Sequence, residues 1–156
     1  MARNTADFTM FMAGNVLKDE TIEYVASKRM GTPVLNDNGE PTGEIEPVAW
    51  KIKAIDSDLD EKIRKESTKK IPVAGKRGQF TLDTDNELYI GKMCAASIVY
   101  PDLNNAELQD SYKVKKPDEL LKKMLLPGEY TELKAKVMEV NGYDLGMEEL
   151  VDEAKN

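Results

Sequence analysis

Between residues 48 and 54, every second position is apolar. Val48, Trp50, Ile52 and Ala54 alternate with one alanine and two lysines. Successive side chains of a β-strand point to opposite faces, so this spacing predicts a half-buried strand with Trp50 and Ile52 on its inner face. The sole tryptophan of the chain is therefore expected in the core rather than at a binding surface.

Further β signals lie upstream of this strand. Residues 21–30 are rich in β-forming side chains, and the segment after them is rich in glycine, proline and asparagine. Within that segment, the dipeptide Asn38-Gly39 is a strong signal for a hairpin turn. Residues 8–12 have the apolar spacing of a short helix. Residues 1–55 are thus expected to form a small antiparallel β element preceded by a helical turn.

From residue 56 onward, the apolar spacing changes to three and four residues, which is typical of amphipathic helices. Ser57 and the capping box Thr84-x-x-Glu87 are predicted to begin the first two helices. Residues 71–80, with one proline and two glycines, are predicted to form a loop between them. The second of these helices is apolar nearly all round and is expected to be buried. The expected helices cover residues 58–69, 88–100, 106–112, 117–126 and 130–140, with a last acidic amphipathic stretch at 147–154.

Together these elements predict an α+β fold, in which a small N-terminal antiparallel β hairpin or sheet packs on a mainly helical C-terminal two thirds. A chain of 156 residues fits one domain. We divide this single domain, residues 1–156, into a β-rich part (1–55), a helical part (56–143) and an acidic amphipathic tail (144–156).

The residue types present exclude several kinds of chemistry. The sequence contains no histidine, which removes Ser-His-Asp triads, Cys-His dyads and nearly every zinc site. The single cysteine, Cys94, excludes an intramolecular disulfide. Its place in the buried-helix pattern predicts a small hydrophobe rather than a reactive thiol. We therefore expect no enzymatic activity, no bound metal and no cofactor.

The charge of the chain is unevenly distributed. The net charge is −7, which disfavours general binding to nucleic acids and anionic membranes. Residues 62–77, however, contain seven basic residues and one acid. We define a basic patch within this segment, expected on a surface helix and the loop after it, as Lys69, Lys70, Lys76 and Arg77.

Two alternatives to a protein-binding role stay open. Residues 62–77 could serve a nucleic-acid-binding accessory factor by following a phosphate backbone, although the stretch lacks interleaved aromatic residues. Asp102, which follows a proline, and Glu132, which stands two positions before Lys134, resemble the signature of a metal-dependent nuclease. Glu132 and Lys134 lie in a helical pattern, where residues two apart face different directions.

No stretch of the sequence has the length and apolarity of a membrane span, and none has the basic-then-apolar order of a signal peptide. We therefore expect the protein to remain in the cytoplasm without a membrane partner.

Several phrases of the sequence occur in an order that is typical of one family. They are VAWKIKAI at 48–55, PVAGKRGQFT at 72–81, AASIVYPDL at 95–103 followed by AELQDSY at 106–112, and LLKKMLLPGEY at 120–130. From about residue 8 to residue 144 the chain resembles the XkdN/YqbN family of prophage and phage proteins. It departs from the family in residues 31–47, which are longer than is usual there, and in the acidic tail.

This resemblance implies a non-enzymatic tail assembly chaperone of long-tailed phages. Such proteins coat the long helical tape measure protein before the tail tube polymerises around it, and they are absent from the finished virion. The expected partners are the tape measure protein, the major tail tube protein and further copies of the chain. The expected place of action is the cytoplasm of the bacterial host.

The partner-binding surface is expected on the C-terminal helices. A tape measure helix exposes apolar stripes before the tube covers it, and the apolar stripes of residues 120–130 and 130–140 are candidates to contact them. The residues predicted for this surface are Leu121, Met124, Leu125, Tyr130, Leu133 and Val137.

Overall fold

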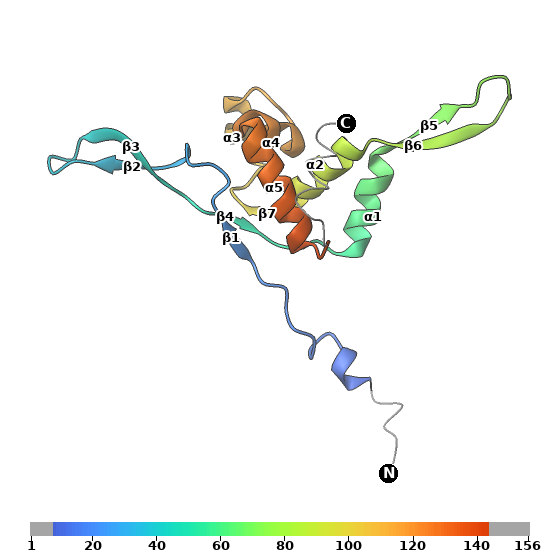
Figure 1. Ribbon diagram of the computed structural model, residues 1–156, viewed down its shortest axis with the longest axis horizontal. Coiled ribbons are helices and arrows are strands. Elements are labelled where there is room, and N and C mark those ends of the chain that lie inside the picture. The colour runs from blue at the N-terminus through green and yellow to red at the C-terminus, as the bar shows by residue number, and fades with distance from the viewer. Residues whose placement is uncertain (1–7, 144–156) are drawn as a thin grey trace, which may run out of the picture.

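The computed structural model describes residues 8–143 of the chain, so residues 1–7 and the predicted acidic stretch at 147–154 lie outside it. The described residues form a small core of helices. Two β-hairpins and the N-terminal segment extend away from this core in different directions (Figure 1). The N-terminal segment contains a single turn of 3-10 helix, η1 (Thr9–Phe11), which confirms the short helix predicted there.

The helical core is built around α2 (Asn86–Ser97). Helices α1 (Ser57–Glu66), α4 (Pro117–Met124) and α5 (Pro127–Val140) all pack against it, and α3 (Ala106–Ser111) precedes α4 in the chain. Met93 and Cys94 of α2 are almost fully buried, which confirms that this helix is central. The other buried apolar side chains are Ala26, Trp50, Ile52, Ile63, Tyr89, Ile98, Leu103, Leu120, Leu121, Met124, Leu125, Leu133, Val137 and Met138.

One three-stranded antiparallel sheet is part of the core. Its strand order is β1 (Ile22–Tyr24), β4 (Trp50–Ile52), β7 (Ile98–Tyr100), so the predicted strand of alternating residues lies in the middle. Trp50 and Ile52 are both buried, as the alternation predicted, and Lys51 between them is exposed. The sheet therefore joins the N-terminal third of the chain to its centre.

The first hairpin consists of β2 (Gly31–Leu35) and β3 (Pro41–Pro47), which pair antiparallel. In its turn, the side-chain oxygen of Asn36 accepts hydrogen bonds from the amides of Asn38 and Glu40, both at 2.9 Å. Gly39 has a positive φ of 79°, a conformation that favours glycine. The hairpin predicted from Asn38-Gly39 is thus confirmed.

The prediction of a mainly helical C-terminal two thirds is wrong, because strands and small sheets occur along most of the described chain. The largest departure is a second hairpin, β5 (Thr68–Pro72) and β6 (Phe80–Thr84), in the segment predicted as the end of a helix and a loop. Gly75 and Gly78, predicted as loop residues, have positive φ and form the turn between the two strands.

Strand β7 is a further departure. The helix predicted over 88–100 ends at Ser97, because Ile98 takes an extended conformation with ψ at 115°. The three residues that follow α2 pair with β4, with Ile98 opposite Ile52. Isoleucine, valine and tyrosine favour strands, so this preference and the available edge of β4 prevail over the helical spacing.

Helix termini agree with the predicted chemistry but not always with the predicted residue. Asp56 rather than Ser57 caps α1, since its carboxylate accepts a hydrogen bond from the amide of Leu59 at 2.8 Å. Similarly, Asp85 rather than Thr84 caps α2. The cap at Asn105, Pro117 in the first turn of α4 and Gly142 with positive φ after α5 are confirmed.

Candidate functional site

The residues predicted for partner binding lie mainly inside the core. Leu121, Leu133 and Val137 have no exposed surface. Met124 and Leu125 are also buried, and Tyr130 is partly buried. A stripe that faces the core has the same helical spacing as one that faces a partner, so the sequence could not separate the two. Partner binding by these residues stays a prediction, and it would require α4 and α5 to move away from α2.

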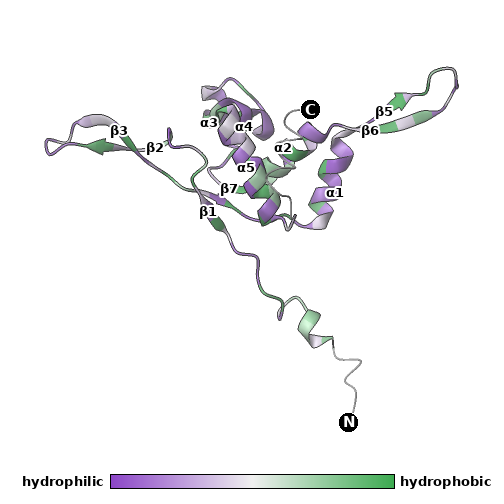
Figure 2. Ribbon diagram, in the orientation of Figure 1, coloured by the Kyte–Doolittle hydropathy of each residue, from purple (hydrophilic) through white to green (hydrophobic). Residues whose placement is uncertain are grey.

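The exposed apolar side chains lie elsewhere, mostly on the parts that extend from the core. Leu17 in the N-terminal segment is 94% exposed and Leu82 on β6 is 73% exposed. Figure 2 shows apolar residues on both hairpins and in the N-terminal turn. The large apolar residues exposed on these extensions are Phe8, Met10, Phe11, Met12, Val16, Leu17, Val34, Leu35, Ile71, Phe80 and Leu82. A sequence search for helical stripes misses them, because they do not lie on long helices.

The basic patch lies on the second hairpin. Lys69 and Lys70 are on β5, opposite Asp83 and Leu82 respectively, instead of on the predicted surface helix. Lys76 and Arg77 lie in the turn of this hairpin, and all four basic residues are exposed. The hairpin thus combines positive charge with exposed apolar side chains at some distance from the core (Figure 1).

The residues of the nuclease alternative have ordinary structural surroundings. The carboxylate of Asp102 accepts a hydrogen bond from the amide of Asn104 at 3.0 Å. Glu132 is exposed on α5, where Lys134 lies over the ring of Tyr130 at 4.8 Å. Among residues 8–143, no three side chains suited to hold a metal ion lie together. The described residues therefore provide no assembled site for divalent-ion chemistry.

The Cys94 thiol is a structural group. It is fully buried in α2, and burial raises its pKa to about 12, although nearby Lys134 acts in the opposite direction. The thiolate is the reactive form of cysteine, so the folded protein holds this side chain unreactive at neutral pH. This confirms the prediction of a small buried hydrophobe.

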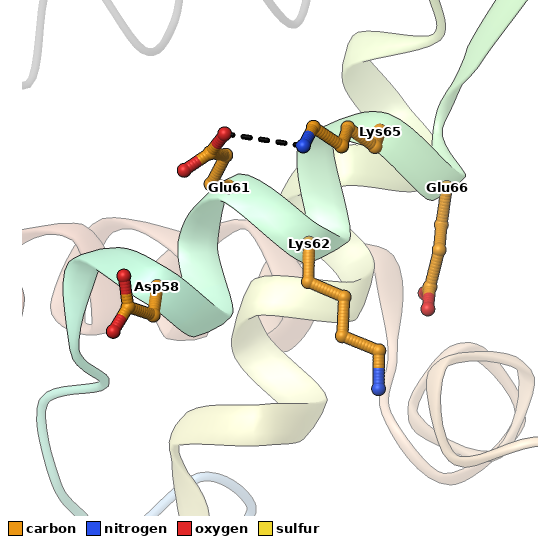
Figure 3. Close-up of a pocket in the computed structure, with 5 residues that line it drawn as sticks. All are labelled: Asp58, Glu61, Lys62, Lys65 and Glu66. Atoms are coloured by element: carbon orange, nitrogen blue, oxygen red, sulfur yellow. Dashed lines mark ion pairs between the residues drawn. The ribbon is translucent and has the colours of Figure 1, made fainter.

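A shallow hollow of about 300 Å³ lies beside α1 and is lined by charged side chains of this helix alone. In Figure 3, Lys65 and Glu61 form an ion pair of 3.2 Å, while Lys62 and Glu66 point toward another side of the helix. Ligand pockets in proteins are mostly apolar, with a few polar groups that fix orientation. Every side chain that lines this hollow is charged and comes from one helix, so the hollow is better described as part of a solvated helix face.

Tyr89 fastens α1 to α2. Its hydroxyl donates a hydrogen bond to the carboxylate of Asp60 and accepts one from Arg64 at 3.0 Å. The guanidinium of Arg64 also lies 4.5 Å from the centre of the ring. Burial, together with the bond to Asp60, raises the pKa of Tyr89. The cluster holds α1 against α2.

Comparison with known proteins decides the family. Residues 8–155 match the phage XkdN-like tail assembly chaperone proteins. The chain belongs to this family. Like its XkdN-like relatives, it is a phage tail assembly chaperone by family. Within residues 8–143, no helix is long and apolar enough to cross a membrane.

Two relatives from Bacillus subtilis (strain 168) cover nearly the whole XkdN-like chain. The phage-like element PBSX protein XkdN is 30% identical over 154 residues, which is 98% of this chain and 96% of XkdN. The protein YqbN is 30% identical over 151 residues, or 96% of this chain and 93% of YqbN. The crystal structure of YqbN is similar to this fold with a TM-score of 0.68 and 26% identity, covering 90% of this chain and all of that one.

Proposed function

We propose that this XkdN-like protein is a non-enzymatic chaperone that binds the tape measure protein and assists assembly of the tail tube in the cytoplasm of the bacterial host. The observation that carries the proposal is the set of exposed apolar side chains on segments that extend from the core. Large groups of exposed apolar side chains on soluble proteins often mark a site where a partner binds. A long helix with apolar stripes is a partner that such segments can reach.

The N-terminal segment is the best-suited part of this surface. Six of its large apolar side chains are at least half exposed, among them Phe11 and Leu17. They are close together in the chain, so a single segment can cover several turns of an apolar stripe. The net charge of −7 supports the same role, because like charges keep many chaperone copies on one helix soluble.

Co-expression with the tape measure protein of the same phage tests the proposal. The parent chain should keep the tape measure protein in the soluble fraction and co-purify with it. The variant Phe11→Ser/Leu17→Ser should lose much of this effect. The matched control Val25→Ser/Val99→Ser removes exposed apolar side chains outside the extended segments and should behave like the parent. If the tape measure protein is as insoluble with the parent chain as without it, the proposal is wrong.

A second candidate function is binding to nucleic acid through residues 62–77. The observation in its favour is the placement of four exposed basic residues on one two-stranded hairpin, a shape that fits the major groove of DNA. Titration of the parent chain with duplex DNA at several salt concentrations tests it. Affinity that falls steeply with salt, and that the variant Lys69→Glu/Lys70→Glu/Lys76→Glu/Arg77→Glu lacks, would support this function over the first.

A further inference from the structure

The two hairpins carry opposite charge. The first, residues 31–47, is called the acidic hairpin, and the second, residues 68–84, the basic hairpin. The acidic hairpin contains four acids and neither lysine nor arginine; the acids are Asp37, Glu40, Glu44 and Glu46. The basic hairpin contains the four residues of the basic patch and one acid, Asp83. In a chain with a net charge of −7, the basic hairpin is an exception to the surrounding charge.

Both hairpins also present apolar side chains to solvent. In the acidic hairpin, Pro33 pairs with Ile45 and Leu35 with Pro41. In the basic hairpin, Phe80 and Leu82 stand two residues apart on β6 and so share one face, with Pro72 and Lys70 opposite them on β5. Leu35, Phe80 and Leu82 are each more than half exposed. Each hairpin therefore has an apolar surface beside charges of a single dominant sign.

Neither hairpin is covered by the rest of the described chain. The extensive contacts of β2 are with β3, and those of β5 are with β6. An isolated two-stranded hairpin is marginally stable in water and leaves strand edges unpaired. A partner that buries one face would remove apolar surface from water and stabilise the hairpin conformation.

The two hairpins leave the core on opposite sides, so within one molecule they do not meet (Figure 1). We propose that the acidic hairpin of one copy binds the basic hairpin of a second copy of this chain. The apolar faces pack against each other, and the opposite charges lie at the margins of the contact. Because the two surfaces differ and lie at opposite ends of the molecule, each added copy presents a new free hairpin. This is a heterologous contact, which gives a ring of subunits where successive rotations close and an open-ended chain where they do not.

The contact is expected to be weak in free solution. A hairpin of 17 residues offers a contact well below the roughly 1,200 Å² that stable complexes bury. Neighbouring copies would therefore associate mainly at high local concentration, and the screening of charges by salt would weaken them further. These contacts join copies of the chain alone and are independent of which other protein the extended segments bind.

Paired charge reversals test the proposal in the full-length chain. The first variant reverses the basic hairpin with Lys69→Glu, Lys70→Glu, Lys76→Glu and Arg77→Glu. The second variant reverses the acidic hairpin with Asp37→Lys, Glu40→Lys, Glu44→Lys and Glu46→Lys. The double variant combines both sets and keeps the net charge of the parent. Circular dichroism and thermal unfolding of each variant show whether the core stays folded, which is expected because all eight side chains are exposed.

Sedimentation velocity from about 1 μM to about 1 mM, a range that brackets weak contacts, gives the decisive readout. The mass of the parent and of the double variant should rise with concentration past that of a dimer, and each single-hairpin variant should stay monomeric. An equimolar mixture of the two single-hairpin variants should associate again. A parent that stays monomeric, one that stops at a dimer, or a basic-hairpin variant that associates like the parent would overturn the proposal. So would a parent that stays monomeric alone and uses its basic hairpin to bind duplex DNA.

Discussion

The hydroxyl oxygen of Tyr130 on α5 lies 3.0 Å from the point where a Cβ would stand on Gly91 of α2. Helices α2 and α5 therefore approach closely at a position where α2 has no side chain. Glycine in the middle of a helix lowers the stability of the helix by about 1 kcal/mol relative to alanine. At position 91, the absence of a side chain leaves room for the Tyr130 hydroxyl.

This contact leads to a prediction from a double-mutant cycle. In the parent, Gly91→Ala should increase the free energy of unfolding little or not at all, because the new methyl group crowds the Tyr130 hydroxyl. In a Tyr130→Phe background, the same change should stabilise the fold by up to about 1 kcal/mol, the propensity difference. Urea unfolding of the four proteins measures both effects. Equal effects of Gly91→Ala in the two backgrounds would show that the hydroxyl is not the obstacle.

Stability should fall at alkaline pH. The pKa values of Tyr24, Tyr89 and Tyr130 are all raised above the ordinary value of 10.0, in each case mainly by burial. A group whose folded pKa is raised stabilises the fold below its unfolded pKa, and this contribution is lost as the pH rises toward the folded pKa. The urea midpoint should therefore decrease above about pH 10. The variant Tyr89→Phe/Tyr130→Phe should have a lower urea midpoint than the parent at pH 7, and this midpoint should decrease less toward alkaline pH. If the midpoint of the variant falls with pH as much as that of the parent, this account is wrong.

Asn141 joins three parts of the core. Its side-chain oxygen accepts a hydrogen bond from the amide of Ile55 at 2.9 Å, and its amide nitrogen donates to the hydroxyl of Ser97 at 3.0 Å and to the carbonyl of Val137 at 2.8 Å. Asn141→Ala should lower the free energy of unfolding by about 1–2 kcal/mol, since the Ile55 amide and the buried Ser97 hydroxyl lose a partner. The exposed Asn104→Ala is a matched control and should change it by less than about 0.5 kcal/mol. Chemical unfolding measures both variants. Equal losses of stability in the two would show that the hydrogen bonds of Asn141 do not account for the effect.

Cys94 provides a probe of unfolding. With the thiol fully buried and its pKa at about 12, native protein should react with a thiol reagent only through opening of the core. The labelling rate at pH 8 should therefore rise with urea in step with the unfolded population. A rapid reaction in the absence of urea, at the rate of a free cysteine, would show that α2 is not held in the core as described.

The sequence predicted those parts of the fold in which local chemistry is decisive. The alternation around Trp50, the Asn38-Gly39 turn and Pro117 at the start of α4 all act within a few residues, and all are confirmed. By contrast, Ile98 joins a strand because the edge of β4 lies beside it in space, which no local pattern encodes. The β5–β6 hairpin was missed because its turn glycines are equally compatible with a loop.

The candidate surface was harder to predict for a similar reason. Leu133 and Val137 have the spacing of a binding stripe, yet that stripe faces α2 and the core. Phe80 and Leu82 alternate with polar residues on β6. The same alternation occurs in a strand that packs on the core and in one that binds a partner, so the sequence cannot separate the two. Only the arrangement in space shows that nothing in the described chain covers them.

The acidic hairpin enters and leaves the fold at a single point. The amide of Val48 donates to the carbonyl of Met30 at 3.1 Å, and Gly31 lies so close to the backbone of Glu46 that a side chain there has no room. Everything beyond this junction can lengthen, shorten or change sequence without altering the central sheet. The hairpin is thus a separable module, in which the surface offered to a second copy can change while the strands of the central sheet stay as they are.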